Sequence, residues 1–193
     1  MLVPSIITAD EASVWLGSPT VDSDAAFTNT VNAANAAVTA VLQWDPTSQL
    51  RTEYYSGRGT GVLTPNASSI TGITSISIYQ GTNANALPVD VTQCIIDRWQ
   101  IIWRGGSFPV GLKNVTLVYT AGYLADSAEM QAIRQAAFQT MKAMWTGRGA
   151  DQNASSESFP GVLSQGFWAG GPGQVPPQAR ALLAPYALKM IAS

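Results

Sequence analysis

The sequence lacks the residues on which most catalytic sites depend. It has 193 residues, of which none is histidine and one is cysteine. The absence of histidine removes the commonest general base, the usual serine and cysteine triads and most zinc sites. The single Cys94 permits no intrachain disulfide and no multi-cysteine metal site, and its apolar neighbours indicate a buried side chain. The sequence therefore shows no evident catalytic apparatus, and we expect no metal and no cofactor.

Charge is also scarce. Asp, Glu, Lys and Arg make up 11% of the residues, against about a quarter in an average globular chain. The formal net charge is −2 and the basic residues are scattered singly, which argues against binding nucleic acid by neutralising phosphates. A surface so poor in charge is typical either of a protein covered by partners or of a low-charge soluble domain.

Long apolar runs are missing as well. No stretch reaches the roughly 18 uninterrupted apolar residues of a membrane span. The start "MLVPSIITADE" lacks the basic residues of a signal peptide. We expect a soluble, unexported chain with no membrane partner, and the single cysteine fits a reducing cytoplasm.

The hydrophobic pattern predicts three helices, over residues 8–16, 22–44 and 126–146. Thr8 with Glu11, and Asp126 with Glu129, have the spacing of a capping box. Apolar residues at helical spacing predict core-facing stripes, namely Phe27, Val31, Ala34, Val38 and Val41, then Met130, Ile133, Ala137, Met141 and Met144.

Between the second and third helices, about residues 51–123, turn and β-branched residues predict four to six short strands. "TEYYSGRGTGVL" predicts a hairpin around Gly57–Gly61, and the alternation in "CIIDRWQIIW" predicts Trp99 and Trp103 in the core of the β block. The fold class is therefore α+β, a bundle of about four helices with an inserted β block. We expect one domain over residues 1–146 and an extended, flexible arm with a short final helix over residues 147–193.

Two features of the β block leave other functions open. Glu53 and Asp97 both lie in predicted strands and are the best candidates for a glycosidase pair, although nothing in the sequence fixes their distance. Four aromatic residues can form a sugar platform, which makes a carbohydrate-binding domain an alternative; they are Tyr54, Tyr55, Trp99 and Trp103.

A family resemblance rests on three stretches. The first is "VTLVYTAGYLADSAEM", residues 115–130, which runs from a strand through a glycine into a helix. The second is the short helix followed by a longer one before the β block. The third is "ARALLAPY" at residues 179–186. In this order they resemble the head–tail adaptor (connector) proteins of tailed bacteriophages. Two departures are that the family usually has Pro after "AGY", where this chain has "LADSAE", and that the Gly-rich arm is longer. The arm puts the position of the final helix in question.

The resemblance implies a virion structural protein of the neck, not an enzyme, assembled in the host cytoplasm. Such adaptors form a ring, commonly of twelve copies, that joins the portal protein to a neck or tail-completion protein. Double-stranded DNA passes through the lumen without sequence-specific binding. The C-terminal segment often docks on the portal, which nominates as contacts Phe167, Trp168, Arg180, Leu182, Leu183 and Tyr186. Packing within the chain is the alternative role of these residues, and a stopper or terminator is the alternative neck protein.

Overall fold

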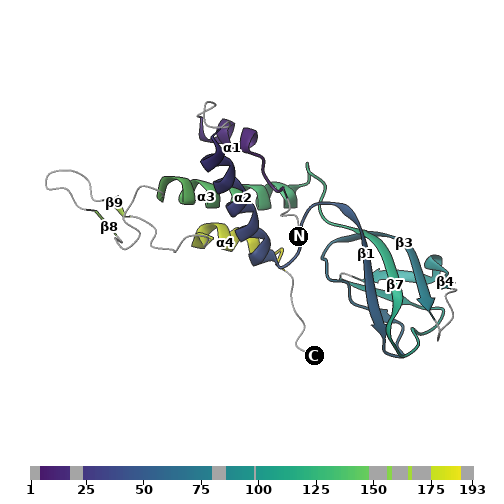
Figure 1. Ribbon diagram of the computed structural model, residues 1–193. Coiled ribbons are helices and arrows are strands. Elements are labelled where there is room, and N and C mark those ends of the chain that lie inside the picture. Colours follow the sequence, from purple (N-terminus) through teal and green to yellow (C-terminus); the bar gives the residue numbers. More distant parts are fainter. Residues whose placement is uncertain are drawn as a thin grey trace. The chain divides into compact units, whose positions relative to one another are not determined.

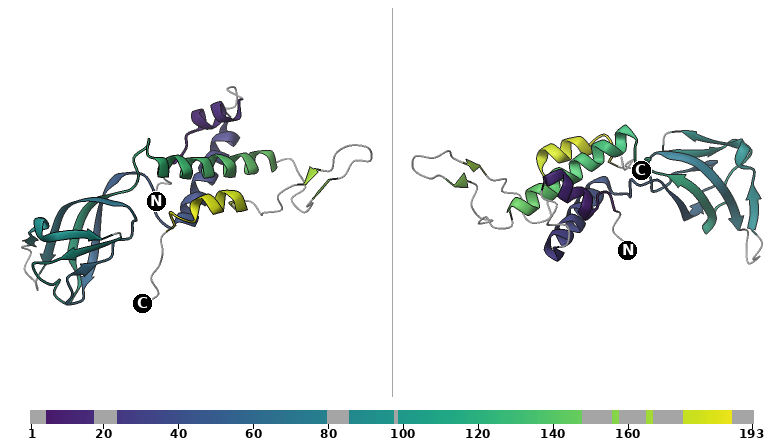
Figure 2. Two further views of the ribbon diagram at one scale, coloured as in Figure 1. Left: turned by 180° about the vertical axis from the view of Figure 1, so that it is seen from behind. Right: turned by 90° about the horizontal axis from the view of Figure 1, so that it is seen from above.

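The computed structural model describes residues 5–17, 24–79, 86–97, 99–147, 156–157, 165–166 and 175–187. The chain divides into two compact units, a helical unit from residues 1–43 and 126–193 and a β unit from residues 44–125. The β unit is thus an insertion between the second and third helices (Figures 1 and 2). This arrangement confirms the α+β class expected from the sequence. None of the helices in the described ranges is long and apolar enough to cross a membrane.

The helical unit contains α1 (Ala9–Leu16), α2 (Ala25–Leu42), α3 (Ala128–Thr146) and α4 (Pro177–Leu183). A short antiparallel pair, β8 (Ser156–Glu157) and β9 (Gln165–Gly166), precedes α4 in the chain. α3 contacts the other three helices and runs alongside α4 in the views of Figures 1 and 2. α2 also contacts the other three helices, so α2 and α3 together form the centre of this unit.

Side-chain caps define the starts of the first three helices. The capping box of α1 is confirmed, since the Glu11 amide donates to Thr8 Oγ1 and the Thr8 amide donates to Glu11 Oε2. Asp24 caps α2 by accepting from the Ala26 amide at 2.8 Å. In α3 the cap is Ser127, which accepts from the Met130 amide, and not Asp126 as the spacing predicted. Each cap satisfies an amide that has no partner within its helix.

The helical stripes face the core largely as predicted. On α2 the fully buried residues include Phe27, Val31, Ala34 and Val38, with Leu42 in place of the half-buried Val41. On α3 the predicted residues are buried except for the half-buried Met144; those buried are Met130, Ile133, Ala137 and Met141. The rings of Phe27 and Trp145 meet edge to face at 5.0 Å between centroids. These contacts join α2 to α3.

The final helix contributes to the same core. Val175, Ala179 and Leu183 are buried, and α4 contacts both α2 and α3. Pro177 stands in the first turn, where its missing amide hydrogen costs no helical hydrogen bond. The arm expected before this helix lies mostly outside the described residues.

The ion pair between α1 and α3 predicts an acid-sensitive contact. Burial tends to raise the pKa of Glu11, but hydrogen bonds from Thr8 and the Arg134 guanidinium, 2.5 Å away, outweigh it and hold the pKa below its ordinary value. A carboxylate whose pKa is lower in the folded state than in the unfolded state stabilises the fold at pH values above the unfolded-state pKa. This stability is lost as the pH falls through the folded-state pKa. Between about pH 5 and pH 3 we expect wild type to lose more stability than Glu11→Gln, measured by urea unfolding. Equal losses in the two proteins would contradict the role of this pair.

The β unit contains two antiparallel sheets. The four-stranded sheet has the order β1-β7-β3-β4, and the three-stranded sheet has the order β2-β6-β5. The strands are β1 (Gln49–Gly57), β2 (Val62–Leu63), β3 (Ile70–Tyr79), β4 (Ala86–Val89), β5 (Cys94–Asp97), β6 (Gln100–Trp103) and β7 (Gly111–Ala121). Buried side chains come from both sheets, including Leu63 and Ile101 from the smaller one and Ile76, Val115 and Leu117 from the larger one. A core filled from both sheets is typical of a β-sandwich.

Two sequence predictions about strand pairing were wrong. Gly57–Gly61 does not close a hairpin, because β1 pairs with β7 whereas β2 pairs with β6 in the other sheet. "CIIDRWQIIW" is not one alternating strand but a hairpin of β5 and β6, in which Cys94 pairs with Trp103. Trp99 and Trp103 are consequently half-buried, and Cys94 is also only partly covered. The smaller sheet draws its fully buried side chains from aliphatic residues such as Ile101.

Candidate functional site

The portal contacts nominated from the sequence fall into three groups. Phe167 and Trp168 lie outside the described residues. Arg180 and Leu182 are exposed on α4, Leu182 with 37% of its surface accessible. Leu183 is fully buried within the chain, and Tyr186 is half-buried, with its amide donating to the Leu183 carbonyl. Within the described part of this set, only the side chains of Arg180 and Leu182 are exposed.

The carboxylate that sequence analysis considered for catalysis has a structural role. Glu53 Oε1 accepts from the Tyr119 hydroxyl at 2.9 Å, while Oε2 accepts from the Tyr55 hydroxyl and from the Asn66 amide. Burial and the adjacent Glu53 carboxylate raise the pKa of Tyr119 well above its ordinary value, so this hydroxyl remains a donor. Asp97 belongs to the other sheet and is exposed. Both carboxylate oxygens of Glu53 thus accept hydrogen bonds within the β unit, including the bond from β7 to β1.

The proposed sugar platform does not form one surface. Tyr54 and Tyr55 are neighbours in β1 and point to opposite faces, Tyr54 being 63% exposed and Tyr55 bonding to Glu53. Trp103 instead packs against Phe108 at 5.3 Å between ring centroids. Among the residues that the structure describes, no three His, Cys, Asp or Glu side chains are grouped to hold a metal ion.

The most exposed apolar group of the β unit lies where four strands meet at one end of the larger sheet. Tyr55 of β1 and Ile78 of β3 both pair with Val115, near the start of β7. Tyr79 at the end of β3 pairs with Ala86 at the start of β4. We call this end the β tip, after the exposed apolar residues that line one hollow there, which are Tyr79 (38% exposed), Val110 (80%) and Leu112 (87%). Large apolar side chains gathered in water commonly mark an interaction surface.

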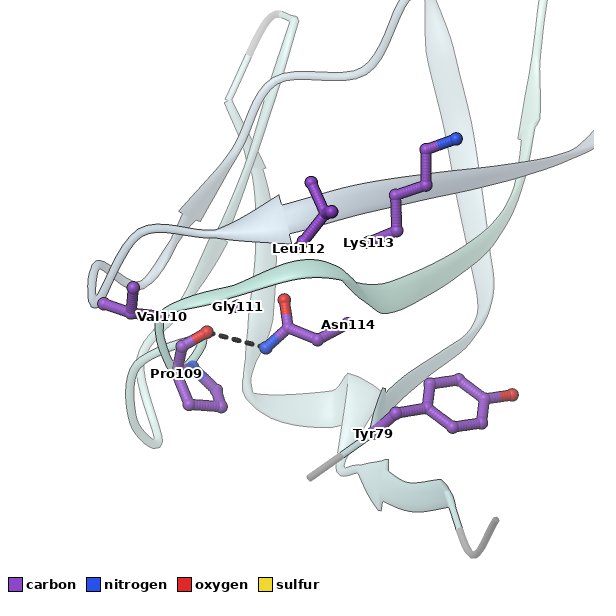
Figure 3. A pocket seen from close by; sticks show the side chains of 7 residues that line it. All are labelled: Tyr79, Pro109, Val110, Gly111, Leu112, Lys113 and Asn114. Carbon is purple, nitrogen blue, oxygen red and sulfur yellow. Dashed lines mark hydrogen bonds between the residues drawn. The ribbon is translucent and has the colours of Figure 1, made fainter. Parts of the chain in front are cut away.

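A bulge in β7 shapes the β tip. Ser56 of β1 lies opposite three residues of β7, Leu112 to Asn114, between two regular pairs. Lys113 within the bulge has a φ of 48°, a left-handed conformation that costs a non-glycine residue about 1 kcal/mol. Leu112 and Lys113, although adjacent, consequently extend to the same side of the strand in Figure 3. Regular alternation would have sent them to opposite faces.

The Asn114 side chain holds this bulge in place. Its Oδ1 accepts from the Gly57 amide at 2.7 Å, and its Nδ2 donates to the Pro109 carbonyl at 2.8 Å, the bond dashed in Figure 3. The Lys113 amide donates to Ser56 Oγ at 3.1 Å. These bonds satisfy backbone groups that the interrupted ladder would otherwise leave without partners.

Two glycines allow the backbone to close around Asn114. A Cβ atom at Gly57 would stand 1.9 Å from the Pro109 carbonyl oxygen, and one at Gly111 would stand 2.6 Å from Asn114 Nδ2. Both distances are shorter than any van der Waals contact, so the bulge requires glycine at these positions. The conformation that brings Leu112 and Lys113 to one side is therefore built into the sequence.

An open hollow of about 380 Å³ lies beside the bulge (Figure 3). It is lined by Tyr79, Pro109, Val110, Gly111, Leu112, Lys113 and Asn114. Its walls include the most exposed apolar side chains of the β unit, which suits contact with another protein better than enclosure of a small molecule.

The charges beside the β tip are all of one sign. Residues 56–61 and 104–114, which form the neighbouring loops and the bulge, contain Arg58, Arg104 and Lys113 and no carboxylate. A Cβ at Gly59, next to Arg58, would touch Val110 Cγ2 at 3.5 Å, so this loop adjoins the exposed valine. The β tip therefore combines an apolar centre with basic neighbours.

Sequence reasoning did not select the β tip. The alternation of Val115, Leu117 and Tyr119 placed those residues on the inner face, and continuing it toward the start of the strand puts Leu112 on the outer face. The signal in the sequence that could have indicated the β tip was a leucine at an outward-facing strand position next to Gly111. The bulge itself depends on contacts with Gly57 and Ser56, which no local pattern reveals.

Comparison with known proteins gives a likeness of fold. No protein-family model and no curated protein matches the chain. A chain in the neck of an empty gene transfer agent particle, with C6 symmetry, is 18% identical with a TM-score of 0.64, covering 100% of this chain and 96% of that one. A chain in the virion of the native gene transfer agent particle gives the same values. A chain in the neck of the native particle, with C12 symmetry, is 17% identical with a TM-score of 0.61 and the same coverage. The chain therefore shares its fold, along its whole length, with proteins found in those particles.

Proposed function

We propose that this chain is a structural component of the neck of a phage-like particle, and specifically its head–tail adaptor. The observation that carries the proposal is the whole-length likeness of fold to chains in gene transfer agent necks. The low charge of the sequence and its lack of histidine support a structural role over a catalytic one. The helical frame around the β unit favours an adaptor over a stopper or terminator.

In this proposal, copies of the chain assemble head to tail into a closed ring, of twelve copies as the adaptor resemblance implies. The necks that contain similar chains were computed with C6 and C12 symmetry, which accords with such a number. A heterologous contact that closes by rotation yields a ring of this kind. The ring joins the portal protein to a neck or tail-completion protein, and double-stranded DNA passes through its lumen without sequence-specific contacts.

The C-terminal part of the chain is the proposed portal-docking element. Arg180 and Leu182 are exposed and supply a charged and an apolar contact. Phe167, Trp168 and Tyr186 remain proposed contacts on the basis of the family resemblance. Leu183 supports the helix from within, since its side chain is buried in the helical unit.

Co-expression with the portal protein of the same genome tests this function. We expect a portal complex carrying an additional ring, seen by size exclusion and negative-stain imaging. Arg180→Glu combined with Leu182→Asp is expected to weaken ring attachment by at least about thirtyfold, as the loss of an interface anchor does. Gln135→Asp, a change at an exposed position of α3, is the matched control. Substitution tests the docking surface more specifically than truncation before α4, because truncation would also remove the buried Ala179 and Leu183 from the core.

The outcomes distinguish the adaptor function from the assignment of α4 as the docking element. A ring that survives the double substitution would retain the adaptor function and reject α4 as the docking element. No association of wild type with the portal would reject the adaptor assignment and favour a stopper or terminator later in the neck.

A further inference from the structure

The β tip has features that folding of the β unit does not require. Val110 and Leu112 are 80% and 87% exposed, so they contribute little to the core. The left-handed Lys113 and the sterically required Gly57 and Gly111 restrict the sequence in order to hold a bulge. Strained backbone supported by its surroundings is concentrated at sites that act on something else. The bulge therefore displays its side chains to a partner.

We infer that the β tip inserts into an apolar recess, bordered by carboxylates, on a different protein of the neck. This inference rests on the proposed function, because it takes the chain to be a neck component. Val110 and Leu112 supply the apolar insert, and Arg58 and Lys113 supply the charges that carboxylates on the partner would meet. Complementary charge at the rim of such a contact fixes its orientation and increases the rate of association.

The chemistry of the β tip favours a protein over DNA. Phosphate binding uses clusters of Lys and Arg, and gains nothing from exposed aliphatic side chains. Here the two most exposed residues are aliphatic, and the basic residues stand beside them. A recess on a protein can contact both the aliphatic and the basic side chains of the β tip.

A different protein is also favoured over a second copy of this chain. Several described carboxylates of the chain already accept hydrogen bonds within it, namely Glu11, Asp24, Asp45, Glu53 and Asp90. Their lone pairs are committed to caps, turns and the Glu53 network. The described carboxylates outside these networks are Asp10, Asp97, Asp126 and Glu129, and no three carboxylates of the described residues are grouped together as the border of a recess would require.

Site-specific photocrosslinking in assembled particles tests the inference. We would incorporate p-benzoylphenylalanine at position 112 of the full-length chain in cells that produce the particles, purify the particles and irradiate them. The control carries the same group at position 50, because Leu50 is 62% exposed on the same sheet and pairs with Thr120, at the opposite end from Gly111. We expect position 112, but not position 50, to crosslink to a different neck protein, at a peptide flanked by Asp or Glu.

Substitutions then measure what each part of the β tip contributes. Binding of the purified chain to the crosslinked protein is expected to weaken at least about tenfold in Val110→Ser/Leu112→Ser, and to remain unchanged in Leu50→Ser. Lys113→Glu is expected to weaken binding at low salt and less so at high salt, because rim charges are screened. Thermal unfolding of these variants should match wild type, since the replaced side chains are exposed.

The possible outcomes each decide the question. Crosslinks from position 112 to another copy of this chain or to DNA would overturn the inference, as would a crosslink from position 50 alone. Binding that is indifferent to all three substitutions at the β tip would overturn it as well. Particles whose necks lack the wild-type chain would reject the proposed function itself, and the inference with it, before any crosslink is examined.

Discussion

Replacing Gly122 with alanine is expected to unfold the β unit under conditions in which wild type is stable. Gly122 has a φ of 119°, which an L-residue other than glycine rarely adopts. A Cβ atom there would stand 2.3 Å from the Thr47 carbonyl oxygen and 2.6 Å from the Ser48 nitrogen. Both obstacles are backbone atoms, so no side-chain rotation can relieve the clash.

The contacts around Gly122 explain why the backbone cannot move aside. The Tyr123 amide donates to the Pro46 carbonyl at 2.8 Å, and the Ser48 amide donates to the Tyr123 carbonyl at 3.2 Å. Thr47 and Tyr123 form a parallel bridge, so the first and last segments of the β unit are joined here. Relief of the clash requires breaking this junction, and we expect the free energy of unfolding to fall by more than about 4 kcal/mol.

Chemical denaturation followed by tryptophan fluorescence measures this effect. Trp44 is buried and packs edge-on against Tyr123 at 5.7 Å between ring centroids, so its emission should respond when the junction opens. Gly72→Ala is the matched control, because a Cβ at Gly72 meets nothing within 4 Å and its φ is not positive. That variant is expected to stay within about 0.5 kcal/mol of wild type. A Gly122→Ala protein with a wild-type unfolding midpoint would show that the segments rearrange at little cost.

The helices were predictable from sequence because their signals are local. Thr8 and Glu11 lie three residues apart and bond to each other, and the stripe from Met130 to Met141 follows the helical period within one segment. The class of fold followed from the same local patterns. Caps were less certain, since neighbouring polar residues compete and Ser127 forms the bond that Asp126 was expected to form.

The strand pairing and the β tip were not predictable, because both depend on contacts between distant residues. Period-two alternation identifies a strand but not its partner, and β1 pairs with β7 across more than half of the β unit. Gly57 looked like a hairpin glycine, whereas it is required by the Pro109 carbonyl 52 positions later. The placement of Lys113 on the same side as Leu112 likewise depends on Asn114 bonding to Gly57 across two strands.

Asn35 illustrates the same limit in the helical unit. In sequence it is one of several Asn and Thr residues on an uncharged helix, yet it is 2% exposed. Its Oδ1 accepts from the Ile7 amide at 3.2 Å, and its Nδ2 donates to the Ile7 carbonyl at 2.9 Å. Ile6 and Ile7 are themselves buried, so water cannot replace these bonds. One side chain thus fixes the segment before α1 to α2.

Asn35→Ala is therefore expected to lower the free energy of unfolding by about 2–4 kcal/mol, because it leaves a buried N–H and a buried carbonyl without partners. Asn32→Ala, at an exposed position of the same helix, removes the same amide group and should be neutral or slightly stabilising through helix propensity. Urea unfolding gives the two free energies, and hydrogen exchange at the Ile7 amide reports the local bond. Because the bond joins the segment before α1 to α2, we expect this amide to lose protection even under conditions where α2 and α3 remain folded. If the Ile7 amide stayed protected in Asn35→Ala, the burial of Ile6 and Ile7 alone would be sufficient to hold the segment, and the asparagine would be dispensable.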